Sequence, residues 1–206
     1  IYVTHVISPL PPVIVPHSCQ LASAMGALLN DDSNDLADIT FRVGPAEEPV
    51  RAHKAILCAR SAYFAAMFRP GGLNESSADE VRISEHSVPA FRKVLEFIYT
   101  SDVKNLQEDK FQDIFEVICL SSEYMLGELQ TLCEKTVMTA INTDNVCDCF
   151  VFATKQFCSP ELQIYCQDFV IANIDKLRVD EHFRSVVAQS PCLALLLVDH
   201  VSGNHK

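Results

Sequence analysis

Positive charge is scarce in this sequence of 206 residues, which holds 16 Lys and Arg residues against 27 Asp and Glu residues. The formal net charge is therefore −11. Such a surface repels the phosphate backbone of DNA and RNA, so we expect no nucleic-acid partner. Long apolar runs are missing as well. Because a helix needs about 20 apolar residues in a row to cross a bilayer, we expect no membrane span.

Motifs that carry catalysis are also absent. The sequence has no Gly-rich phosphate loop, no Gly-x-Ser-x-Gly or His-Glu-x-x-His motif, and no group of Cys and His residues at ligand spacing. We therefore expect a protein that is not an enzyme and that holds no metal and no cofactor. The first residue is Ile1 rather than Met, which we interpret as a sign that the chain is a piece of a longer polypeptide.

The nine cysteines are odd in number and irregular in spacing, and most lie in apolar helical patterns. This usage predicts reduced, buried thiols in the cytoplasm, the nucleus or both. Cys58 is a separate case because it follows Lys54 closely and precedes Arg60, and nearby cations lower the pKa of a thiol. Cys58 is either a reactive thiol or an inert buried one.

The front of the chain reads as a linker followed by an amphipathic helix. Residues 1–17 hold four prolines, which prevent a helix or a central strand, so we expect an extended segment there. Ser18 is a suitable N-cap, and apolar residues then recur on one helix face. This face needs a partner, and its residues are Leu21, Met25, Leu28 and Leu29.

A mixed α/β unit is predicted for residues 18–137. Apolar and polar residues alternate over 38–43, a return strand follows at 50–52, and Val81 and Ile83 indicate a third strand. A helical stretch runs from His53 to Phe68, and Ser87 caps another helix. The apolar set of the next helix extends to Met125, and Gly127 permits a break after it.

The remainder, 138–206, is predicted to be all-helical. Thr143 is a candidate cap for one helix, and Ser159-Pro160 is a cap followed by proline at the first helical position. Asp180 and Ser190 each precede a further short helix.

One apolar residue stands alone in a polar loop. The stretch MFRPGGLNESS ends a helix at Pro70-Gly71-Gly72 and then places Leu73 among polar residues. A loop gains nothing from an exposed leucine, so Leu73 either folds back onto its own chain or is buried by another molecule.

Together these elements resemble a known domain. The stretches LADITFRV, AHKAILCARSAYFAAMF, VRISEHSVPAFRKVLEFIYT and LSSEYMLGELQTLCEKTV, in this order, resemble a BTB (POZ) domain. The tail TDNVCDCFVFATKQFCSPELQIYCQDFVIANIDKL resembles the three-box and first BACK helices of cullin-3 ubiquitin ligase substrate adaptors. The resemblance implies an α+β BTB/POZ fold, with a small, mostly three-stranded sheet flanked by helices, followed by an all-helical three-box and partial BACK extension.

The resemblance also implies roles for particular residues. Leu73-Asn74-Glu75 matches an apolar-x-Glu signature in which Leu73 enters a pocket of the cullin-3 N-terminal domain and Glu75 makes a polar contact beside it. Phe68 belongs to the same docking set. Asp38 and Lys54 match a charged pair at the floor of a dimer groove, although a half-exposed surface pair is the alternative. The first helix matches a homodimer interface, with packing on the chain's own sheet as the alternative, and His53 is a structural histidine.

Two functions follow from this resemblance. The first is a non-catalytic, homodimeric adaptor module that docks cullin-3 while a protein substrate binds outside this segment. The alternative is the BTB domain of a transcription regulator that recruits corepressor peptides to its dimer groove. The helices after residue 142 favour the adaptor.

Overall fold

A three-stranded sheet forms one end of the molecule. The computed structural model describes residues 20–30, 36–71, 78–155, 158–191, 193–195 and 197–198. In the sheet, β1 lies in the middle, antiparallel to β2 and parallel to β3. Its side chains alternate between buried and half-buried, as the period of two predicts. The strands are β1 (Ile39–Val43), β2 (Glu48–Ala52) and β3 (Glu80–Ile83).

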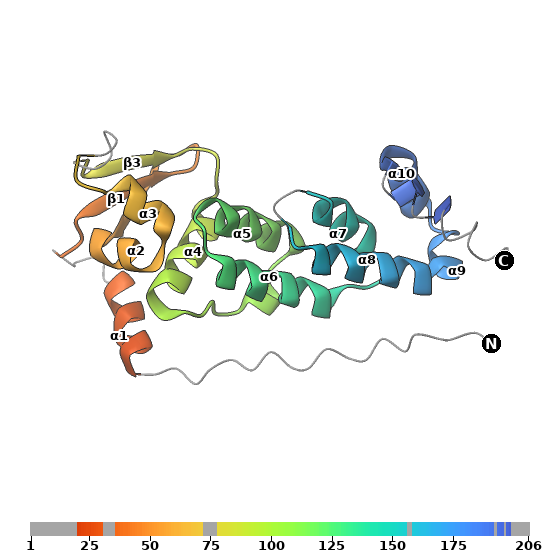
Figure 1. Cartoon of the computed structure of the whole chain (residues 1–206), viewed down its shortest axis with the longest axis horizontal. Helices are drawn as coiled ribbons and strands as arrows, with labels where there is room; N and C mark the ends of the chain where they lie inside the picture. Colours follow the sequence, from red (N-terminus) through yellow and green to blue (C-terminus); the bar gives the residue numbers. More distant parts are fainter. Residues whose placement is uncertain are drawn as a thin grey trace.

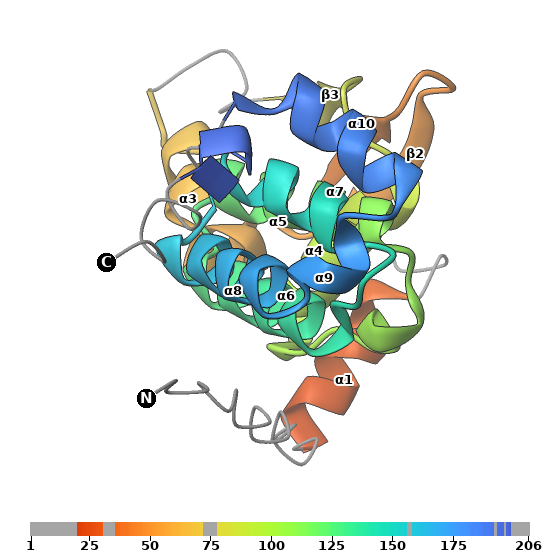
Figure 2. The same ribbon diagram turned by 90° about the vertical axis from the view of Figure 1, so that its right-hand side faces the viewer.

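Helices extend away from the sheet in a row (Figure 1). α1 crosses α4 beside the sheet, α5 and α6 form the middle of the molecule, and α7 and α8 continue the row. The view along the row shows α6 and α8 side by side (Figure 2). None of the helices in the described ranges is long and apolar enough to cross a membrane. The helices are α1 (Gln20–Leu29), α2 (Lys54–Arg60), α3 (Ala62–Met67), α4 (Val88–Thr100), η2 (Leu106–Glu108), α5 (Phe111–Glu123), α6 (Gly127–Ala140), α7 (Val146–Ala153), α8 (Pro160–Ala172), α9 (Ile174–Leu177) and α10 (Glu181–Gln189).

Aromatic side chains join the sheet to the helices. The Phe41 ring of β1 meets Phe91 of α4 edge-on, with 5.0 Å between centroids, and Phe64 of α3 meets Tyr124 at the same distance. All four residues are buried. Edge-on aromatic pairs stabilise beyond the area they bury, by about 0.5–1.5 kcal/mol each. This cluster therefore fixes α3, α4 and the end of α5 on one face of the sheet.

The helical stretch predicted from His53 to Phe68 is two helices. Ser61 separates them with an extended backbone, and its hydroxyl accepts a hydrogen bond from the N–H of Phe64. The same hydroxyl donates to the carbonyl of Tyr124 at 2.8 Å. Ser61 is buried, so this pairing satisfies a polar group that would otherwise be unpaired in the core. The break is therefore set by a contact with a distant segment.

Two predicted helix boundaries differ from those observed. α5 ends at Glu123, and Met125, which was placed in its apolar set, has a positive φ of 56° and is 67% exposed. Thr143 does not cap α7, which begins at Val146. Asn145 Oδ1 instead accepts from the N–H of Asn142, so the polar side chains form a turn before the helix starts.

Other predicted caps are confirmed. The side chains of Ser87, Ser159 and Asp180 each accept a hydrogen bond from the backbone N–H three residues later. α6 continues to Ala140, so the predicted division between residues 137 and 138 falls within a helix. Ser18 and residues 1–17 lie outside the described residues.

Candidate interaction surfaces

Helix α1 packs against α4, so its apolar face has a partner within its own chain, and that partner is a helix rather than the sheet named as the alternative. The approach is close, since a Cβ atom at Gly26 would lie 3.3 Å from Cγ2 of Thr100. Even so, no residue of α1 is fully buried, and Leu21 keeps 64% of its surface exposed. α1 thus still presents apolar surface, and its role in a homodimer stays a prediction. The predicted interface residues that are half-buried are Met25, Leu28 and Leu29.

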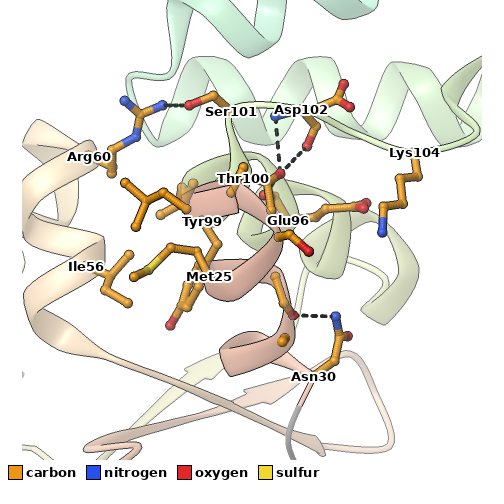
Figure 3. Close-up of a pocket in the computed structure, with 16 residues that line it drawn as sticks. Met25, Asn30, Ile56, Arg60, Glu96, Tyr99, Thr100, Ser101, Asp102 and Lys104 are labelled. Atoms are coloured by element: carbon orange, nitrogen blue, oxygen red, sulfur yellow. Dashed lines mark hydrogen bonds between the residues drawn. The ribbon is translucent and has the colours of Figure 1, made fainter. Parts of the chain in front are cut away.

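A groove of about 770 Å³ lies between α1, α2 and the end of α4 (Figure 3). Met25 and Ile56 give it apolar walls. Its rim is polar and includes Arg60, which donates a 2.8 Å hydrogen bond to the hydroxyl of Ser101. Ser101 ends α4 and has a positive φ of 60°. Apolar walls surrounded by a polar rim are typical of a surface that binds a protein side chain.

The phenol of Tyr99 lies in this groove and is held by His53. It accepts from the backbone N–H of His53 at 2.9 Å and lies 2.7 Å from Nδ1 of the same residue. A phenol has one hydrogen, so both contacts are satisfied when it donates to a neutral Nδ1. Burial raises the pKa of Tyr99 to about 12. His53 therefore has the structural role predicted for it.

Asp38 and Lys54 meet through the backbone of Lys54. Its N–H donates to Asp38 Oδ1 at 2.7 Å, which satisfies a free N–H at the start of α2. The ammonium group points elsewhere: it donates to the carbonyl of Ala78 at 2.7 Å and lies 5.5 Å from the centre of the Phe68 ring. The two residues are thus neighbours, as the resemblance implies, and their part in a dimer groove stays a prediction.

The predicted docking residues Leu73 and Glu75 lie outside the described residues. Their described flanks both contact Lys54, since Phe68 precedes the segment and Ala78 follows it. Phe68 is 8% exposed and stacks on Phe64 with 6.2 Å between centroids. Its ring is therefore part of the core beside the segment, and a direct docking role for it stays a prediction.

The helical extension is joined to the α/β unit by two contacts. Phe152 of α7 stacks on Phe115 of α5 with 3.9 Å between ring centroids. Glu134 of α6 is buried, and its Oε1 accepts the N–H of Ser159 at 3.0 Å at the start of α8. A buried, hydrogen-bonded carboxylate and an aromatic stack both fix orientation, so α7 and α8 have a defined place relative to the BTB-like part.

The surroundings of Cys58 argue against a reactive thiol, and the choice between a reactive and an inert Cys58 stays a prediction. Burial raises the pKa of Cys58, Asp38 raises it further, and only Lys54 lowers it. Its thiol lies 3.6 Å from the carbonyl of Phe64. Burial also raises the pKa of Cys133 and Cys166 to about 12. The cysteines in the described ranges are free, and their reduced state in the cell stays a prediction.

Sequence reasoning missed several residues at these surfaces. Arg60 was named only as a neighbour of Cys58, and Ser61 and Glu134 were not named at all. The sequence gives no clear signal for either buried residue, because Ser61 follows Arg60 and Glu134 precedes Lys135, so each reads as part of a polar stretch. Such a residue either faces solvent or has a specific partner, and only the structure decides which.

Comparison with known proteins gives a family match. The family model described as BTB/POZ domain matches residues 28–141. The BTB/POZ and MATH domain-containing protein 3 of Arabidopsis thaliana is 31% identical over 197 residues, which cover 89% of this chain and 47% of that protein. The human BTB/POZ domain-containing protein 9 is 29% identical over 193 residues, covering 93% of this chain and 30% of that protein. The chain thus spans about half or less of the length of these relatives.

Solved structures of the same domain are also similar. The BTB domain of zebrafish PATZ1 is 24% identical and covers 58% of this chain and 92% of its own, with a TM-score of 0.45. The BTB domain of human Gigaxonin is 24% identical and covers 61% of this chain and 95% of its own, with a TM-score of 0.44.

Proposed function

This chain belongs to the BTB/POZ family, and we propose on that basis that it is a non-catalytic, homodimeric adaptor module that docks the N-terminal domain of cullin-3 in a ubiquitin ligase. A protein–protein adaptor is the general role of such domains. The finer claims, namely cullin-3 as partner, the homodimer and a cytoplasmic or nuclear location, belong to this proposal. The substrate would bind to a part of the protein outside this segment, as a MATH domain in the Arabidopsis relative's name suggests.

The observation that carries the proposal is the attachment of α7 and α8 directly behind the BTB-matching residues. The Phe115–Phe152 stack and the Glu134–Ser159 hydrogen bond hold these helices against α5 and α6. A partner that contacts both the BTB part and the extension therefore meets a surface of fixed shape. This favours a docking module over a domain that leads into a flexible linker.

A second observation concerns the segment that holds Leu73 and Glu75. Lys54 contacts Phe68 before the segment and Ala78 after it, so both ends of the segment are held by one side chain. This arrangement supports the use of the segment for docking, with Leu73 as the apolar anchor and Glu75 beside it.

Calorimetric titration of the chain with the cullin-3 N-terminal domain tests the proposal. Leu73→Ala should weaken binding about thirty-fold, because a buried apolar anchor contributes about 2 kcal/mol. Glu75→Ala should cost less if its contact stays partly hydrated. Leu195→Ala is a matched control, since Leu195 is a leucine with 62% of its surface exposed in the C-terminal helices.

Two results would change the assignment. If the intact, folded chain shows no binding, the cullin-3 adaptor is excluded and the corepressor groove of a transcription regulator becomes the better candidate. The 770 Å³ groove beside α1 gives that alternative a surface to use. If binding is tight but unaffected by Leu73→Ala, the adaptor stands and its anchor lies elsewhere.

A further inference from the structure

A second groove, here called the β2–α4 groove, adjoins the first one where α1 packs on α4. It has a volume of about 370 Å³ and is bounded by the C-terminal end of α1, strand β2 and helix α4. Phe68, the one described residue of the predicted cullin-3 docking set, does not line it, and of the predicted dimer residues only Leu29 does. The groove shares Gly26, Asn30, Glu96, Thr100 and Lys104 with the 770 Å³ groove, whereas Arg51, Arg92 and Lys93 line the β2–α4 groove but not the larger one.

The charge of this groove is opposite to that of the chain. Four of the chain's 16 Lys and Arg residues line it, against one of its 27 Asp and Glu residues. The acid is Glu96, whose carboxylate accepts a hydrogen bond from the backbone N–H of Lys104 and is therefore already used within the chain. A cationic groove on an acidic protein attracts a short anionic segment and directs it there, because the rest of the surface repels it. The four basic residues are Arg51, Arg92, Lys93 and Lys104.

The cations differ in how firmly they are already paired. Lys93 lies 2.6 Å from Asp109, and both side chains are mostly buried, so this pair is part of the fold. Arg92 lies 3.5 Å from Glu48, with 52% of each side chain exposed. A pair as open as that contributes little, and Arg92 can turn to a ligand at small cost. Lys104 is exposed at the end of the groove.

The groove also has an apolar component. Leu29 is half-buried and Pro49 is exposed, so both offer apolar surface to a ligand, whereas Val50 and Leu95 belong to the lining but are buried. A small inorganic anion needs no apolar contact, whereas a peptide with an apolar side chain between acidic residues uses both parts. The combination of cations and apolar side chains thus indicates the chemistry of the ligand.

We propose that the β2–α4 groove docks an acidic peptide segment of a partner protein, with carboxylates beside Arg92 and Lys104 and an apolar side chain against Leu29 and Pro49. The N-terminal residues 1–19 of this chain cannot supply the charge, since they contain no Asp or Glu. The docking is independent of the cullin-3 proposal, and each can fail without the other.

The test is fluorescence anisotropy of a short labelled peptide in which acidic residues flank a leucine, titrated with the intact chain. The Arg92→Glu, Lys104→Glu double variant should weaken binding about ten-fold or more, because two attractive charges become repulsive. The Lys176→Glu, Arg178→Glu double variant is the control. It makes the same change in net charge, and Arg178 has an exposed partner, Asp175 at 3.3 Å, as Arg92 has Glu48. The control should bind like the parent chain.

Substitution of Glu96 gives a test in the opposite direction. Glu96→Gln removes the one acid that lines the groove and keeps an oxygen to accept the Lys104 N–H, so it should strengthen binding about three-fold. Added salt should weaken binding of the parent chain and affect the charge-reversed variant less. If charge reversal unfolds the chain, the Arg92→Gln, Lys104→Gln variant, which adds no repulsion, takes its place.

Four outcomes overturn the proposal. If the groove variant and the control lose the same affinity for the peptide, the attraction comes from net charge alone. If neither the parent chain nor Glu96→Gln binds the peptide, the groove is not a binding site. The acidic residues that follow Asn30 in the sequence, Asp31, Asp32 and Asp35, lie outside the described residues. If the peptide binds only when these three residues are replaced by Asn, the groove is occupied by this chain's own segment. If only the Met25→Asp, Leu28→Asp variant binds, a second copy covers the groove.

Discussion

The ammonium group of Lys54 donates a 2.7 Å hydrogen bond to the backbone carbonyl of Ala78. This bond ties the first turn of α2 to the residues that lead into β3. The backbone N–H of Lys54 donates to Asp38, just before β1, so one residue connects three segments that are far apart in the chain.

Replacing Lys54 by Met should destabilise the fold. The substitution keeps the apolar stem but removes the bond to Ala78 and the contact of the ammonium with the Phe68 ring, which together contribute about 1–3 kcal/mol. Urea unfolding should show this loss, and Lys176→Met, at an exposed position of α9, should show none. Equal stability of the two variants would mean that the bond to Ala78 stabilises the fold no more than hydration of the Lys54 ammonium group in the unfolded chain does.

Replacing Met25 and Leu28 by Asp should give a folded monomer. Four acidic groups in each dimer would lie in an apolar contact if α1 forms the interface, and unpaired charges there cost far more than the contact gains. Sedimentation velocity of the variant and its parent measures the change. Since α1 also packs on α4, circular dichroism must first show that the helices persist. A folded variant that stays dimeric would move the interface away from α1.

Tyr99 should make stability depend on pH in the alkaline range. Its pKa is raised to about 12 by burial, whereas the tyrosines of the unfolded chain titrate near 10. Between these values the unfolded state has released the proton and the folded state has not. The contribution of Tyr99 to the free energy of unfolding is therefore fully present below about pH 10, and it is lost as the pH rises from about 10 to about 12.

The control for this dependence is Tyr99→Phe, because buried cysteines and Tyr124 also have raised pKa values. The variant loses the hydrogen bond to His53 at every pH, but its stability should fall less steeply over this range. Thermal unfolding at a series of pH values gives both slopes. Parallel slopes would assign the dependence to the other groups.

Cys58 should react slowly with a thiol reagent at neutral pH. Its raised pKa leaves little thiolate, and the thiolate is the nucleophile. The rapid phase of labelling in the folded protein should thus be the same in the parent and in Cys58→Ser. A rapid phase that disappears in Cys58→Ser would restore the reactive-thiol hypothesis.

Local patterns predicted most of the elements correctly. The alternation over 38–43 predicted β1, and the caps at Ser87, Ser159 and Asp180 predicted where helices begin. These features depend on hydrogen bonds and side-chain directions within a few residues, so the sequence contains them in full. The errors at Ser61 and Thr143 came from side chains whose hydrogen-bond partners could not be read from periodicity.

The sequence by itself determined that this is an acidic α+β chain, the order of its three strands and most of its helices, and its resemblance to the BTB/POZ domain. Only the tertiary structure decided what each polar or charged side chain does. It placed α1 on α4, turned the Lys54 ammonium from Asp38 to Ala78, raised the pKa of Cys58, and gathered four cations from β2, α4 and the loop after α4 around one groove. These outcomes depend on burial and on neighbours that are distant in the chain, because the strength of a charge is set by the solvent and the groups around it.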